Sequence, residues 1–148
     1  MASQPGIELR KCAHSVQILV RPDHIDFMGH VNNAEYLRWA QDVTLAFWQR
    51  HATSEDLTRL GWIAREHTIS YFRPAFDGDV IIANVEIESV NGPRVVVLLN
   101  FRRNDKVLAS LKSSWCLVDL SDRRVRRVSD KILSKFSFPQ QEVLALAV

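Results

Sequence analysis

Residues 32–51 read NNAEYLRWAQDVTLAFWQRH and contain neither glycine nor proline. Their apolar side chains recur at the spacing of one helix face: Tyr36, Ala40, Val43 and Phe47. Asn32 or Asn33 can cap the start of this helix, because an Asn side chain accepts hydrogen bonds from the backbone N–H groups there. More apolar residues widen the stripe: Leu37, Trp39, Leu45, Ala46 and Trp48. We therefore expect a long helix, apolar on most sides, that a larger surface buries.

The rest of the chain is mostly predicted strand. Apolar and β-branched residues mark five strands around the helix: residues 13–20, 62–72, 80–90, 94–103 and 106–120. The later strands are joined by short turns, such as NGP at 91–93 and Asn104–Asp105, which leave no room for a crossover helix. A short helix or turn is predicted at 54–61, capped by Ser54 and ended by Gly61. A curved antiparallel five-stranded sheet around one long helix satisfies this order, which is an α+β fold.

The composition describes an ordinary globular chain. It has 148 residues, of which 47% are hydrophobic and 24% charged, with a net charge of +2. This length suits one domain, so we expect residues 1–148 to form a single domain with its core at about 13–130. Residues 129–148 suggest a short C-terminal tail of one or two helical pieces with apolar residues that can pack: Val143, Leu144, Leu146 and Val148.

The charge and the cysteines argue against several functions. A weak net charge, without zinc-finger or helix-turn-helix spacing, argues against a nucleic-acid binder. Arginines crowd one short segment, at 123, 124, 126 and 127, which is either a phosphate contact or a solvated turn. Cys12 and Cys116 form no metal-spaced pair, and we expect Cys116 in the core. MASQPGIELRK lacks an apolar signal core and no run of about 18 apolar residues exists, so we expect a cytoplasmic protein, not a membrane protein.

Polar residues crowd the segment that leads into the helix, DFMGHVNNAEY at 26–36. The first N–H groups of a helix have no intrahelical partner, and they carry the positive end of the helix dipole. Asp26 lies close to these groups along the chain. It is therefore either a loop or capping carboxylate, or a reacting group aimed at the helix start.

Three segments resemble one family. RPDHIDFMGHVNNAEYLRW, at 21–39, is similar to the signature of the hotdog-fold acyl-CoA thioesterases of the 4-hydroxybenzoyl-CoA thioesterase type. The matching positions are Asp26, Gly29, His30, Val31 and Tyr36. YFRPAFDGDVI, at 71–81, resembles the strand–turn–strand of that family, and CLVDLSDRRVRRV, at 116–128, resembles its last core strand and basic exit. The resemblance covers roughly residues 13–130 and implies a single hotdog domain.

The resemblance also implies a catalytic site at the helix start. Asp26 would attack the thioester carbonyl as a nucleophile, or activate a water as a general base. The backbone N–H of Asn33 would stabilise the oxyanion, an effect of about 3–4 kcal/mol for a good donor. Gly29 would allow a tight turn and the close approach of a ligand. His30 would hydrogen-bond Asp26 or a neighbouring loop, or act as a second base.

Further residues are expected to bind the substrate. Candidates for an acyl pocket are Phe27, Met28, Trp39 and Trp62, with a core position favoured for the two tryptophans. His67 and Tyr71 lie four residues apart on one predicted strand and therefore on one face, where they line a pocket or belong to the core or the surface. Arginines align with places where relatives meet coenzyme A phosphates: Arg94, Arg124 and Arg126. The expected set is completed by Asn32, Tyr36 and Gln41.

The resemblance implies hydrolysis of an acyl- or aroyl-CoA, or of an acyl carrier protein thioester, to a free acid and a thiol. It implies no metal and no organic cofactor. A homodimer or homotetramer is expected, because a single hotdog sheet leaves one edge unpaired.

Two alternatives remain open. Many relatives carry an acid where this chain has Gln41, and the nearby acid, Asp42, is rotated by about 100° around the helix. This difference favours a non-catalytic hotdog module that binds acyl-CoA. A hotdog hydratase or dehydratase also uses an acid and a His, but places the pair at a different spacing from Asp26 and His30.

Overall fold

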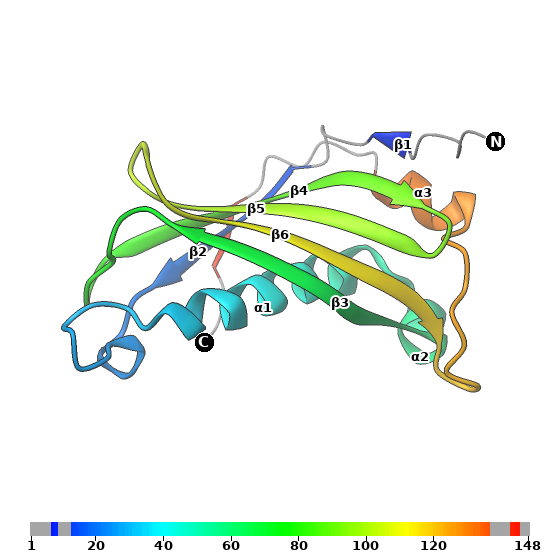
Figure 1. Ribbon diagram of the computed structural model, residues 1–148. Helices are drawn as coiled ribbons and strands as arrows, with labels where there is room; N and C mark the ends of the chain where they lie inside the picture. Colours follow the sequence, from blue (N-terminus) through cyan, green and yellow to red (C-terminus); the bar gives the residue numbers. More distant parts are fainter. Residues whose placement is uncertain (1–6, 9–12, 137–142, 146–148) are drawn as a thin grey trace.

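The computed structural model describes residues 7–8, 13–136 and 143–145 (Figure 1). Its helices and strands follow one another in this order: β1 (Ile7–Glu8), β2 (Ala13–Leu19), the 3-10 helix η1 (Pro22–His24), α1 (Asn33–His51), α2 (Ser54–Arg59), β3 (Leu60–Tyr71), β4 (Val80–Asn91), β5 (Arg94–Arg103), β6 (Lys106–Asp119), α3 (Asp130–Phe136) and β7 (Val143–Ala145). The predicted long helix and the five predicted strands are all present. None of the helices in these described ranges is long and apolar enough to cross a membrane.

One sheet contains all the strands, in the order β3-β6-β5-β4-β2-β7, with β1 beside β4. The five long strands pair antiparallel, as predicted. The expectation of a helical C-terminal tail holds for α3 but is wrong for Val143–Ala145, which form β7 and pair parallel with β2. Short β-branched and apolar runs adopt either structure, and here the free edge of β2 provides backbone partners. Residues 146–148, also expected to pack, lie outside the described residues.

The helix α1 begins where the chain provides a cap. The side chain of Asn32 accepts a hydrogen bond from the Ala34 N–H at 3.0 Å, so Asn32 is the N-cap and Asn33 is the first helical residue. One face of α1 is buried against the sheet, through Tyr36, Trp39, Ala40, Val43, Phe47 and Trp48. The expectation of a helix buried on most sides is wrong in this chain, because Arg38, Asp42 and Leu45 are exposed.

Two smaller expectations also change. Thr53, not Ser54, caps α2: the Thr53 hydroxyl accepts from the Asp56 N–H, and the Asp56 carboxylate accepts from the Thr53 N–H, both at 3.0 Å. Gly61 does not end the helix, since β3 has already begun at Leu60. Cys116 is only half-buried, because it lies on the opposite face of β6 from the core residues Trp115 and Leu117.

The arrangement separates the molecule into two ends. Figure 1 shows α1 beneath the sheet, with the start of α1 at one end and α2 and α3 at the other. The strand register agrees, since Tyr71 at the end of β3 pairs with Ala109, whereas Leu60 at its start pairs with Asp119. The polar segment 26–36 therefore lies at the end where β3 finishes.

Candidate active site

The segment before α1 forms a tight hairpin-like loop. Ile25 and Val31 pair antiparallel, and inside them the Asp26 N–H donates to the His30 carbonyl at 3.0 Å. The Gly29 N–H donates a hydrogen bond to the Asp26 carbonyl at 3.0 Å. The backbone of Gly29 has a φ of 83°. This left-handed conformation favours glycine, whereas a β-carbon added at Gly29 would meet open space. Gly29 is thus required for the turn and not for a close approach within this chain.

One of the two oxygens of the Asp26 carboxylate accepts a hydrogen bond from the same loop. Its Oδ1 accepts from the Met28 N–H at 2.9 Å, which holds the side chain in place. In the described part of the chain Oδ2 has no hydrogen-bond donor, so one carboxylate oxygen is left available for chemistry. His30 does not contact this carboxylate: its Nδ1 lies 3.3 Å from the neighbouring Val31 carbonyl.

Of the first three N–H groups of α1, two have a hydrogen-bond acceptor within the described residues and one has none. Asn32 accepts from the Ala34 N–H through its side chain and from the Glu35 N–H through its carbonyl, at 3.0 and 2.9 Å. For the Asn33 N–H, no acceptor is found among residues 13–136 or the other described residues. Asn33 is exposed, so its N–H is a free donor at the positive end of the helix dipole.

Two contacts fix this helix start in space, and a third residue holds the loop on which one of them depends. The Val31 N–H donates to the Ala75 carbonyl at 2.8 Å, which ties the entry of α1 to the β3–β4 loop. The Tyr71 hydroxyl, at the end of β3, donates to the Asn33 carbonyl at 3.0 Å. The β3–β4 loop is itself held by Arg103, which donates to Asp79 at 2.7 Å and to the Pro74 carbonyl at 3.1 Å. The start of α1, which carries the free N–H of Asn33, is therefore fixed both to the end of β3 and to the β3–β4 loop.

A hollow of about 260 Å³ opens beside this anchored helix start. Four predicted site residues line it: His30, Asn33, Tyr36 and Tyr71. Its other lining residues are Val31, Phe72, Arg73 and Pro74, none of which was predicted as a site residue. The segment YFRPAFDGDVI at 71–81 contains Phe72, Arg73 and Pro74, directly after Tyr71. Its resemblance to the family could therefore have identified these three residues as part of the site. Asp26 lies in the adjoining turn, outside this lining.

The two tyrosines of the hollow are hydrogen-bond donors at neutral pH. Burial raises the pKa of Tyr36 to about 12, and burial also raises the pKa of Tyr71. Tyr36 is only 2% exposed and packs its ring on Tyr71 and Phe101, with ring centroids 5.6 and 5.3 Å apart. Among the described residues its hydroxyl has no hydrogen-bond partner. Tyr36 therefore forms the floor of the hollow, whereas Tyr71 fixes its rim.

Other predicted binding residues lie outside this hollow. His67 is half-buried on β3, 2.8 Å from the Ser113 hydroxyl, with its ring 5.9 Å from that of Trp115. Burial lowers the pKa of His67, so its neutral form is favoured. Gln41 is half-buried on α1, whereas Asp42 is exposed, so the neighbouring acid does not take the place of Gln41.

The apolar candidates divide into exposed and packed residues. Phe27 is 96% exposed and Met28 is 63% exposed, so in this chain neither lines an enclosed acyl pocket. Trp39 is buried in the core, as expected, and Trp62 is half-buried against it. An acyl pocket that includes Phe27 and Met28 stays a prediction, and it would require another surface against them.

The predicted phosphate contacts lie far from the hollow within one chain. Arg94 is exposed at the start of β5, beside Lys112 on the face of the sheet turned away from α1. Arg126 donates to Asp122 at 2.5 Å and lies 3.8 Å from Asp119, at the end of β6. Arg124 is exposed in the same turn. Since Asp119 pairs with Leu60, this turn lies at the opposite end of β3 from Tyr71.

The comparison with known families fits this arrangement. A family model described as the thioesterase-like superfamily matches residues 20–136, which include the Asp26 loop, α1 and the long strands β3 to β6. The chain belongs to the thioesterase-like superfamily. Membership confirms both the resemblance to hotdog thioesterases and the prediction of a thioesterase. The roles of individual residues stay predictions.

Relatives of this thioesterase-like chain agree in fold. It is 23% identical over 126 residues to the long-chain acyl-CoA thioesterase FadM of Escherichia coli K12, spanning 80% of this chain and 93% of FadM. Slr0204, a 1,4-dihydroxy-2-naphthoyl-CoA thioesterase from Synechocystis, aligns with a TM-score of 0.73 at 15% identity, over 84% of this chain and 95% of Slr0204. The probable thioesterase YbaW from Escherichia coli aligns with a TM-score of 0.71 at 21% identity, over 84% and 96% of the two chains. The predicted hotdog fold is confirmed.

Proposed function

We propose that this chain hydrolyses an acyl or aroyl thioester of coenzyme A, or of an acyl carrier protein, to a free acid and a thiol. Asp26 either attacks the carbonyl carbon, forming an anhydride that water then cleaves, or removes a proton from the attacking water. The C–S bond breaks as the tetrahedral oxyanion collapses, and the leaving thiolate takes a proton from the solvent. No step requires a metal or an organic cofactor.

One observation carries this proposal. Asn33 lines the hollow and has a free N–H, at the positive end of a 19-residue helix whose start is fixed by Tyr71 and Ala75. Such a donor costs no reorganisation when an oxyanion develops, and oxyanion donors contribute about 3–4 kcal/mol to catalysis. Asp26, whose Oδ2 has no hydrogen-bond partner among the described residues, lies in the turn that leads into the start of α1. The pair supplies both requirements of thioester hydrolysis, an attacking group and a place for the charge.

A second copy of the chain would bring the basic turn to the site. β3 is the outer strand of the sheet and pairs only with β6 within the described residues. We propose a homodimer, or a homotetramer built from such dimers, in which two β3 edges pair antiparallel about a twofold axis. The start of the partner's β3 then lies beside Tyr71, and the partner's turn 119–127 comes to the same end of the combined sheet. This arrangement supports the prediction that Arg124 and Arg126 bind substrate phosphates.

Both coenzyme A and the phosphopantetheine of a carrier protein present phosphate to such a turn. We also propose the cytoplasm as the location of the protein. A second candidate function is a module that binds acyl thioesters without cleaving them. It is favoured by Gln41, which is uncharged where the resemblance to hotdog thioesterases leads us to expect an acid.

The test is a screen of purified protein against acyl-CoAs of increasing chain length and against aroyl-CoAs, with a thiol reagent that reports free coenzyme A. We expect turnover well above the uncatalysed rate for at least one class. Binding of an acyl-CoA without release of coenzyme A would favour the non-catalytic module. Loss of the enoyl absorbance of an enoyl-CoA, without release of a thiol, would instead indicate a hydratase.

A further inference from the structure

A line of uncharged residues follows the boundary between α1 and β3, starting at the hollow. On α1, side chains at four-residue spacing share one face: Asn33, Leu37, Gln41 and Leu45. On β3, Tyr71, Ile69 and His67 share one face, and beyond the bulge between Ala64 and Glu66 the residues Ala64 and Trp62 continue this face. At its two ends this face contacts α1, through Tyr71 and the Asn33 carbonyl and through the rings of Trp62 and Trp48. We call these residues the α1–β3 boundary. Leu37, Ile69, Ala64 and Trp62 are each half-buried against the core.

Two hollows lie at the two ends of the boundary, and each is lined by residues from both elements. The first, beside the helix start, is lined by Asn33 of α1 and Tyr71 of β3. The second is lined by Thr44, Leu45 and Trp48 of α1, together with Trp62 of β3. Asn33 and Thr44 are about 16 Å apart along the helix axis, at 1.5 Å per residue. An acyl chain that starts at the Asn33 N–H and follows the boundary therefore ends at the second cavity.

The second cavity suits the end of an aliphatic chain. Nearly all of its lining is apolar, and the aromatic rings of Trp48, Trp62, Trp115 and Phe136 form much of it. Its volume of about 30 Å³ has room for roughly two water-sized groups, and its apolar lining offers a water molecule almost no hydrogen-bond partners. A terminal methyl and its neighbouring methylene would fill it without displacing bound water.

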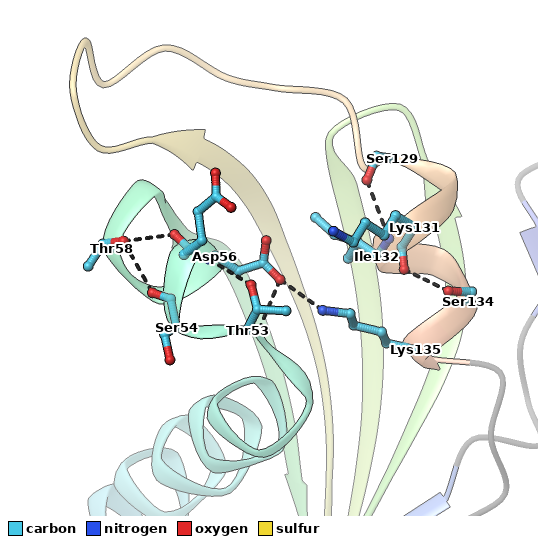
Figure 2. A network of polar contacts seen from close by, with 10 residues as sticks. Thr53, Ser54, Asp56, Thr58, Ser129, Lys131, Ile132, Ser134 and Lys135 are labelled. Atoms are coloured by element: carbon cyan, nitrogen blue, oxygen red, sulfur yellow. Dashed lines mark hydrogen bonds and ion pairs between the residues drawn. The ribbon is translucent and has the colours of Figure 1, made fainter.

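The end of α3 forms one wall of the cavity, through Phe136. Phe136 is buried there, with its ring centroid 5.8 Å from that of Phe47 and 6.5 Å from that of Trp62. Figure 2 shows the polar contacts that hold α3 against α2: Lys135 donates to the Asp56 carboxylate at 2.8 Å, and the same carboxylate accepts from the Thr53 N–H. The side chains of Asp56 and Lys135 are both largely shielded from solvent. These contacts hold α3 in place and keep Phe136 at one side of the cavity.

We propose that the acyl chain of the substrate lies along the α1–β3 boundary and that Phe136 is the residue that sets its maximum length. The preferred substrate is then an aliphatic acyl thioester whose chain spans the distance from Asn33 to the cavity, roughly 12 to 14 carbons. Gln41 and His67 lie midway, and an uncharged Gln at position 41 suits an aliphatic chain better than an acid does. This inference rests on the proposed function, since it places the thioester carbonyl at Asn33.

Binding of S-alkyl-CoA thioethers tests the inference without requiring turnover. A series from S-butyl- to S-octadecyl-CoA is titrated into the full chain, with affinity measured by calorimetry and checked by tryptophan fluorescence. We expect the affinity to rise by up to roughly fourfold for each methylene buried, until the tail reaches Phe136, and then to fall. Phe136→Ala should move this limit to longer chains by about two carbons or more, because it removes the wall of the cavity.

Two further variants separate this effect from a general loss of packing. Leu45→Trp fills the cavity from the exposed side of α1 and should move the limit to shorter chains, even if Phe136→Ala does not fold. Ile132→Ala removes a buried side chain from the same short helix α3, outside the cavity lining, and should leave the limit unchanged. The same limit in the native protein, Phe136→Ala and Leu45→Trp would overturn the inference. Thioether binding that follows the expected pattern, without hydrolysis of the matching acyl-CoA, would refute the proposed hydrolysis alone.

Discussion

Asp26→Asn is expected to lower kcat for thioester hydrolysis by a factor of roughly 10³, with little change in KM. The substitution removes the charged oxygen that attacks or accepts the proton. An Asn side chain still presents an oxygen to the Met28 N–H, the contact that holds Asp26 in its turn. The loop should therefore keep its shape, and the loss should appear in the chemical step. The measurement is steady-state release of coenzyme A from the best substrate of the screen.

Asp42→Asn is the matched control for this variant. Asp42 is an exposed carboxylate on α1, so its replacement removes the same charge without touching the loop before the helix. We expect Asp42→Asn to keep kcat within about twofold of the native value. Equal rates for the native protein and Asp26→Asn would show that the attacking group lies elsewhere. Equal losses in both variants would indicate a general effect of charge.

The second large effect is expected in stability and comes from His14. This residue of β2 is 1% exposed, and among the described residues its Nε2 has no hydrogen-bond partner. Burial, followed by the nearby positive charges of Arg50 and His51, lowers the pKa of His14 to about 4. Between pH 6.5 and 4 the unfolded chain therefore binds a proton here that the folded chain does not. Protonation of this one group should lower the free energy of unfolding by about 3 kcal/mol across this window, and His14 should contribute no further loss below it.

Urea denaturation at pH 7, 5 and 4 measures this loss, with His14→Leu as the comparison. The variant cannot bind the proton, so its free energy of unfolding should fall by about 3 kcal/mol less than that of the native protein. His51 and His67, whose pKa values burial also lowers, are present in both proteins. Asp56, whose pKa is lowered to about 2 mainly by its hydrogen bond from Lys135, loses its stabilising effect only at lower pH. Parallel pH curves for the two proteins would contradict the role of His14.

The fold could be predicted largely because its strongest signals are local. The helix at 33–51 has a long periodic pattern and an Asn cap, and the strands at 80–91 and 94–103 are separated by short turns. The errors fall where local patterns are ambiguous. Val143–Ala145 could have been helix or strand, and their parallel pairing with β2 depends on a distant edge. Thr53 and Ser54 are equally good caps by composition, and only the reciprocal contact with Asp56 favours Thr53.

Of the candidate site, only the loop before α1 and the start of α1 could be predicted from the sequence. The loop, the glycine turn and the helix start come from one continuous segment, so the sequence places them together. Arg73 enters the hollow because the end of β3 returns beside α1, which periodicity does not reveal. Phe27 was expected in a pocket but is exposed, and Arg124 was expected at the substrate but lies at the other end of β3. A role for either residue at the substrate depends on the homodimer proposed above, whose geometry a single sequence does not describe.

The most direct test of the account is the amide signal of Asn33 when a carbonyl binds. A ketone analogue of the best acyl-CoA, with a methylene in place of the sulfur, is added to ¹⁵N-labelled protein and followed by NMR spectroscopy. If the carbonyl accepts a hydrogen bond from the Asn33 N–H, this amide proton should move downfield, by more than those of Ala34 and Glu35, which already donate to Asn32. Saturating binding of the analogue that leaves the Asn33 signal in place would contradict the account.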